Sequence, residues 1–91
     1  MEIKPVDESG DHRTGSVIGL STTEIAEKIG FPANVDDDES KVKYSWGFTV
    51  DGERCGVWDY KGSHRHKIFS TWGPREALRK VFGEHYGSDR D

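Results

Sequence analysis

The chain has 91 residues, of which 32% are apolar and 33% are charged, so it can form one domain with a small core built largely on aromatic side chains. Its net charge of −4 argues against a dedicated binder of duplex DNA, for which a strongly basic domain is expected. The single cysteine, Cys55, excludes an internal disulfide and, with no apolar stretch of membrane-spanning or signal-peptide length, predicts a cytoplasmic protein.

The first third of the chain is predicted to hold a polar arm and one short helix. Residues 1–15 show little apolar periodicity and are expected to form a flexible arm, while residues 16–20 could add a short strand. Ser21 and Glu24 have the spacing of a capping box, and Gly30 is a stop signal. We therefore expect a helix between Ser21 and Gly30, which must dock on a sheet because two turns are not stable alone in water.

Residues 42–60 predict a β-hairpin. Apolar and polar side chains alternate on both sides of Asp51-Gly52, which is a favoured two-residue hairpin loop. Because the loop length sets the register, each strand residue has a predicted partner. The pairs expected to face the helices are Val50–Glu53, Phe48–Cys55, Trp46–Val57 and Tyr44–Asp59. The pairs on the opposite face are Thr49–Arg54, Gly47–Gly56, Ser45–Trp58 and Lys43–Tyr60.

Residues 66–72 are predicted to form a third strand, and a second helix follows it. Gly73-Pro74 starts that helix, with Pro74 at its first position, and Gly83 ends it. Four apolar side chains form the predicted inner stripe of this helix: Ala77, Leu78, Val81 and Phe82.

The order of these elements predicts an α+β domain over residues 16–83. We expect a three-stranded antiparallel meander with two short helices packed on one face, in the order α-β-β-β-α, with residues 16–20 as an extra short N-terminal strand if they pair. Residues 84–91 are expected to form a flexible C-terminal tail.

The outward face of the hairpin is the predicted binding surface. Its side chains are Trp58, Tyr60, Lys43, Arg54 and, if the third strand pairs with the hairpin, Phe69. Trp, Tyr and Arg are enriched at the hot spots of protein interfaces. An alternative interpretation is that Trp58 only covers the bare backbone of the paired glycines Gly47 and Gly56.

Residues 61–67 form a dense basic loop beside this face. Its titratable side chains are Lys61, His64, Arg65, His66 and Lys67. Residues 61–80 carry six basic and one acidic side chain, whereas residues 1–40 carry ten acidic and three basic ones. Basic side chains next to aromatic ones could neutralise nucleic-acid phosphates or contact an acidic protein, and the remaining interpretation is a solvated hairpin loop.

No catalytic or metal site is predicted. His64 and His66 lack the Cys/His spacing of a zinc site, and Cys55 faces inward, where an inert thiol is expected. Asp59, opposite Tyr44, is expected to form hydrogen bonds at the sheet edge. Because the chain also lacks a phosphate-binding glycine loop and a nucleophile elbow, we expect no enzyme, no cofactor and no metal ion.

Several of these segments together resemble a family of short uncharacterised accessory proteins of tailed phages and prophages. The matching segments are Trp46-Gly-Phe, Asp51-Gly52, Val57-Trp58-Asp59-Tyr60-Lys61-Gly62, Gly73 and Val81-Phe82-Gly83. The resemblance implies a small accessory protein that binds a host or viral macromolecule in the host cytoplasm.

The leading prediction is a small non-enzymatic protein-binding module that uses the Trp58 face, with residues 64–67 as a charged rim. The first alternative is a single-stranded nucleic-acid-binding protein that uses the same surface. The second is an acidic decoy, in which residues 36–39 mimic phosphates and inhibit a nucleic-acid-handling enzyme. This run lacks the ligand spacing of a calcium loop, and the remaining interpretation is a solvated loop. The expected partner is thus a protein, with nucleic acid as the alternative and no membrane.

Overall fold

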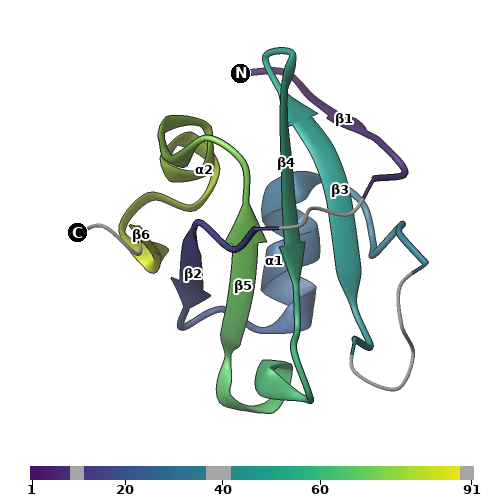
Figure 1. Cartoon of the computed structure of the whole chain (residues 1–91), viewed down its shortest axis with the longest axis vertical. Coiled ribbons are helices and arrows are strands. Elements are labelled where there is room, and N and C mark those ends of the chain that lie inside the picture. The colour runs from purple at the N-terminus through teal and green to yellow at the C-terminus, as the bar shows by residue number, and fades with distance from the viewer. Residues whose placement is uncertain (9–11, 37–41, 89–91) are drawn as a thin grey trace.

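The computed structural model describes residues 1–8, 12–36 and 42–88 (Figure 1). These residues form an α+β fold with a six-stranded antiparallel sheet in the order β1-β3-β4-β5-β2-β6. The strands are β1 (Ile3–Pro5), β2 (Gly15–Ile18), β3 (Ser45–Val50), β4 (Glu53–Trp58), β5 (Ile68–Trp72) and β6 (Tyr86–Ser88). The α-helices are α1 (Thr22–Ile29) and α2 (Arg75–Phe82), and the 3-10 helices are η1 (Ser63–His66) and η2 (Gly83–His85).

The β3–β4 hairpin has the register that its turn predicts. Trp46 pairs with Val57, Phe48 with Cys55, and Ser45 with Trp58. Asp51 and Gly52 have φ values of 50° and 87°, and such positive values at both loop positions match the right-handed twist of the flanking strands. The predicted separation of the two hairpin faces is therefore confirmed.

One face of the sheet is covered by helices and forms the core; we call it the inner face. Figure 1 shows α1 behind β3, β4 and β5. Most hairpin side chains predicted for this face are buried, as are those of the α2 stripe, whereas Glu53 is exposed and Tyr44 half-buried. The buried ones are Trp46, Phe48, Val50, Cys55, Val57, Asp59, Ala77, Leu78, Val81 and Phe82. Both helices therefore contribute to one hydrophobic core.

The ends of α1 match the prediction, whereas the start of α2 differs from it. Ser21 Oγ accepts a hydrogen bond from Glu24 N at 3.2 Å, the Ser21 N–H donates to Glu24 Oε1 at 3.1 Å, and Gly30 ends the helix with a φ of 107°. Pro74 was predicted as the first helical residue, but its ψ of 129° is extended. It is therefore the N-cap of α2, which begins at Arg75.

The sheet has six strands where three were predicted. The optional strand over residues 16–20 is present as β2, which pairs with β5. β1 and β6 lie in the segments predicted as arm and tail; each has three residues, and each adds to a neighbour, β1 to β3 and β6 to β2. Strands of three residues are too short to show an alternating pattern in the sequence, and they form by pairing with a neighbouring strand.

The segment after β1 curls over the second face of the sheet, which we call the outer face. Val6 N donates to Gly47 O at 3.0 Å, and a side chain at Gly47 would overlap the carbonyl oxygens of both Val6 and Glu8. Asn34 completes this edge, because its Oδ1 accepts from Gly47 N and its Nδ2 donates to Gly47 O and Val6 O, each at 3.1 Å. Within the described residues, no helix has both the length and the apolar character that crossing a membrane requires.

Candidate functional site

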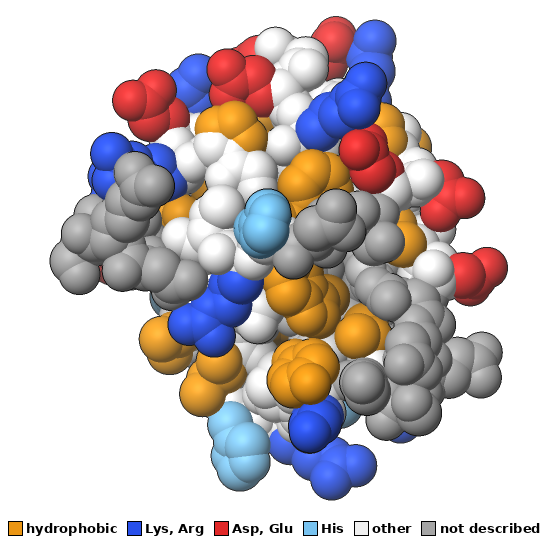
Figure 2. Space-filling view, viewed as in Figure 1, with side chains coloured by type: hydrophobic (Ala, Val, Ile, Leu, Met, Phe, Trp, Pro, Cys, Tyr) orange, Lys and Arg blue, Asp and Glu red, His pale blue; other side chains and the backbone are white. Residues whose placement is uncertain are grey.

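The outer face exposes three apolar side chains near one end of β4, β5 and β2, beside the half-buried Trp58. Ile18 in β2 pairs directly with Ile68 in β5, and the two side chains are 57% and 40% exposed. Trp58 ends β4 and is half-buried, and Tyr60, which is 46% exposed, follows it. Figure 2, in the view of Figure 1, shows hydrophobic side chains at the centre and at the lower left of this face, with others in its upper half. We call Ile18, Trp58, Tyr60 and Ile68 the apolar patch.

The strand register places Trp58, Ile68 and Ile18 on one face of three neighbouring strands. Trp58 pairs with Ser70 of β5, two residues from Ile68 and on the same face. Ile18 flanks Ile68 on its other side, and Tyr60 follows the end of β4 by two residues. Trp58 and Tyr60 were predicted as binding residues. The two isoleucines were missed, because only the pairing of β2 with β5 brings them together.

The bare backbone of the paired glycines is covered, but not by Trp58. A side chain at Gly56 would overlap the indole of Trp72, which lies across it, and Gly47 is covered by the segment after β1. The interpretation that Trp58 covers these glycines is therefore wrong, because the β4–β5 register pairs Gly56 with Trp72.

Phe69 and Arg54 do not belong to the patch. Phe69 is fully buried and packs edge-to-face on Trp46 at 6.1 Å, because the β5 register turns Phe69 and Thr71 toward the inner face. Arg54 lies on the outer face but at the other end of β4, six residues or about 20 Å along the strand from Tyr60, where its Nη1 is 3.4 Å from Glu8 Oε1.

The η1 turn borders the patch with basic side chains. Lys61, Arg65 and Lys67 are exposed, as is His66, and none of them forms an ion pair with a described residue. Lys61 Nζ lies 5.3 Å from the centre of the Tyr60 ring, so it borders the patch directly. We call Lys61, Arg65 and Lys67 the basic rim.

The backbone at both ends of the basic rim is in the left-handed region. Lys61 and Lys67 have φ values of 53° and 56°, in the left-handed region that L-residues other than glycine seldom adopt. One hydrogen bond fixes each end of residues 60–67. Ser63 Oγ accepts from Tyr60 N at 3.0 Å, and Lys67 O accepts from Gly19 N at 2.8 Å. The surrounding structure thus fixes where the rim lies relative to the patch.

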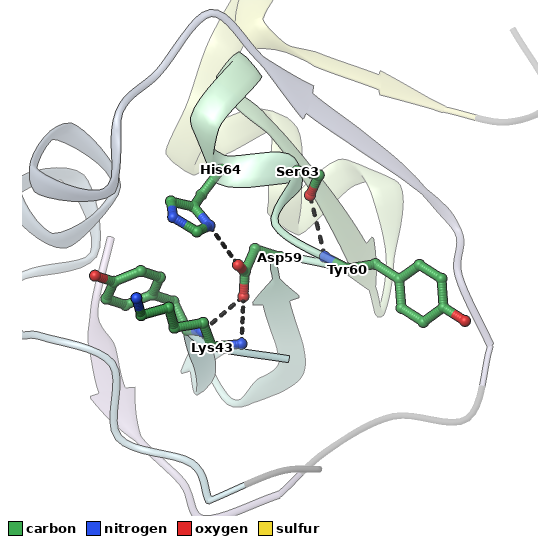
Figure 3. Close-up of polar contacts among 6 residues, drawn as sticks. Lys43, Asp59, Tyr60, Ser63 and His64 are labelled. Atoms are coloured by element: carbon green, nitrogen blue, oxygen red, sulfur yellow. Dashed lines mark hydrogen bonds and ion pairs between the residues drawn. The ribbon is translucent and has the colours of Figure 1, made fainter. Parts of the chain in front are cut away.

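A buried carboxylate anchors η1 from the inside (Figure 3). Asp59 is fully buried, and its Oδ1 accepts from Lys43 N at 2.8 Å and from Tyr44 N at 2.6 Å. Its Oδ2 lies 2.5 Å from Nδ1 of His64, the ring of which stands edge-on to Tyr44 at 5.0 Å. Asp59 N also donates to Tyr44 O at 3.0 Å, so the predicted hydrogen-bonded role of Asp59 opposite Tyr44 is confirmed.

The Asp59–His64 pair has the form of a catalytic dyad but lacks a nucleophile among the described residues. His64 forms its hydrogen bond with Asp59, and no described hydroxyl or thiol bonds to its ring. The His64 side chain is 16% exposed, so it presents less surface at the predicted rim than the exposed Arg65, His66 and Lys67. The pair instead ties η1 to the end of the hairpin, which sets the position of the basic rim.

Cys55 faces the core, as its register predicts, and its burial raises the pKa of the thiol to about 12, with a smaller contribution from Glu53. Because a thiol reacts as its thiolate, we expect native protein at pH 8 to react with Ellman's reagent at least about a hundred times more slowly than the urea-unfolded chain. Equal rates would contradict this burial; the unfolded chain itself is the control for reagent access.

The remaining candidate residues form no metal site within the part of the chain that the structure describes. Among the described residues, no group of three His, Cys, Asp or Glu side chains is arranged to hold a metal ion. Lys43 is exposed at the end of the hairpin that carries the patch. Asp36 is exposed, and the rest of the acidic run at residues 36–39 lies outside the described residues.

Comparison with protein-family models, with curated proteins and with solved structures found no match to this chain.

Proposed function

We propose that the protein is a small non-enzymatic docking module that binds a protein partner through the apolar patch. The observation that carries the proposal is the Ile18–Ile68 pair, in which two aliphatic side chains, 57% and 40% exposed, adjoin Trp58 and Tyr60 on a helix-free face. Burying such surface in an interface stabilises the complex by about 25 cal/mol per Å² of apolar area. Exposed apolar side chains gathered on one surface and bordered by polar ones are typical of interaction sites. In the setting that the phage resemblance implies, the partner is a host or viral macromolecule.

Single-stranded nucleic acid is the second candidate, and the basic rim beside Tyr60 favours it. Nucleic-acid binding of this kind needs planar side chains on which bases can stack. Ile18 and Ile68 are branched aliphatic residues without such a face, and Trp58 is half-buried. These properties support a protein partner over a nucleic acid.

Replacing Ile68 with aspartate tests the proposal, because a charge in the middle of the patch would be buried by any partner that covers it. We expect Ile68→Asp to reduce recovery of specific partners from a bacterial lysate about tenfold or more, measured by quantitative mass spectrometry on immobilised protein. Ala33→Asp, at an exposed position outside the patch, is the matched control and should leave recovery unchanged.

Two results would contradict the protein-docking proposal. One is that no recovered protein distinguishes Ile68→Asp from Ala33→Asp. The other is that a deoxythymidine oligonucleotide shifts the amide signals of Tyr60 and Lys67 in NMR spectra, that the shifts fade with added salt, and that Lys61→Ala/Arg65→Ala/Lys67→Ala abolishes them, which would favour nucleic acid.

A further inference from the structure

We infer that the partner of the apolar patch presents an acidic segment with at least one large apolar side chain; this inference rests on the proposed function. The apolar patch and the basic rim meet at Tyr60, because Lys61 Nζ lies 5.3 Å from the centre of the Tyr60 ring. A partner that covers Ile68 must therefore also approach the rim.

The charges around the apolar patch favour a negatively charged partner. Residues 60–68 contain two lysines and one arginine and no acidic residue. Two of the described acidic groups lie near this end: Asp59, which is buried against His64, and Glu24, whose pKa is lowered by the hydrogen bonds with Ser21 and then by the charges of Lys67 and His85. Glu24 keeps its negative charge in its capping hydrogen bond with Ser21 N, and of the three cations of the basic rim only Lys67 lowers its pKa. The rim charges are thus available to an acidic partner, and a basic one would be repelled.

The backbone around the rim is positioned before any partner arrives. The Asp59–His64 contact, the Ser63–Tyr60 hydrogen bond and the Gly19–Lys67 hydrogen bond hold η1 at both ends and in the middle. A segment that docks there loses its own freedom but does not have to order this loop, which lowers the cost of binding. Carboxylates spaced along an extended acidic segment can meet the rim while an apolar side chain contacts Ile18 and Ile68.

The test is selection from a random 12-residue peptide library displayed on a surface and panned against immobilised full-length protein. We expect the enriched peptides to combine Asp or Glu with Leu, Ile, Phe or Trp. Synthetic copies of the enriched peptides, followed by fluorescence anisotropy, should bind about tenfold more weakly to Lys61→Gln/Arg65→Gln/Lys67→Gln and more weakly at 300 mM than at 50 mM salt. Binding should be lost with Ile68→Asp and retained with Ala33→Asp.

The outcomes separate the inference from the proposed function. Enriched peptides that depend on Ile68 but carry no acidic bias, or that ignore the triple variant, would overturn the acidic partner and leave protein docking in place. Peptides that bind Ile68→Asp as well as wild type, or a failure to enrich any peptide, would overturn both. Sedimentation showing a dimer that Ile68→Asp dissociates would replace the acidic segment with a second copy of this chain.

Discussion

Replacing Asp59 with alanine is expected to destabilise the protein by about 3 to 5 kcal/mol, because three partly buried donors lose a fully buried acceptor at once. The N–H groups of Lys43 and Tyr44 and Nδ1 of His64 all point at this carboxylate. Small domains are stable by only about 5 to 15 kcal/mol, so Asp59→Ala should unfold at a much lower urea concentration than wild type. Urea titration followed by tryptophan fluorescence measures the loss.

Asp59→Asn is the matched control for this prediction. The asparagine Oδ1 can still accept from both backbone amides, and His64 can accept from the asparagine Nδ2 as its other neutral tautomer. We therefore expect Asp59→Asn to cost about 1 to 2 kcal/mol, clearly less than Asp59→Ala. An alanine variant as stable as the asparagine variant would show that Asp59 does not hold the hairpin end. If Asp59→Ala remains folded, the amide signals of residues 61–67 should shift, because η1 has lost its anchor.

The parts of the fold that the sequence could predict depend on contacts between neighbouring segments. The β3–β4 register follows from the two-residue Asp51-Gly52 loop, and α1 follows from its capping box and from Gly30, because each signal lies within a few residues of the contact that it specifies. The burial of Cys55 and the hydrogen-bonded role of Asp59 could be predicted for the same reason.

The parts that could not be predicted depend on pairing between distant segments or on the path of a longer connection. The chain from Tyr60 to Lys67 contains the turn η1, so its length does not set the register of β5, and Phe69 was assigned to the wrong face. The partner of Asp59 was missed because the left-handed backbone at Lys61 and Gly62 turns His64 back toward the hairpin. Likewise, Ile18 joins the patch only through the β2–β5 pairing.

The contact between Gly56 and Trp72 also comes from the β4–β5 register, and it predicts that a side chain at position 56 destabilises the protein. A methyl group at Gly56 would overlap the indole Nε1, Cε2 and Cδ1 atoms of Trp72. The indole must then leave the sheet, so Gly56→Ala is expected to destabilise the protein by about 2 to 3 kcal/mol. Alanine would otherwise be favoured over glycine inside a strand by about 0.5 to 1 kcal/mol.

The sign of the Gly56→Ala effect should therefore depend on whether Trp72 is present. In a Trp72→Ala background the obstacle is gone, and adding Gly56→Ala should be neutral or slightly stabilising, as measured by urea unfolding of the four proteins in a double-mutant cycle. The coupling energy should equal most of the penalty seen in the wild-type background. If Gly56→Ala is equally harmful in both backgrounds, the glycine is required for its backbone rather than for the indole that lies across it. A full rescue would instead show that Gly56 is needed because Trp72, and not Trp58, covers the middle of the outer face.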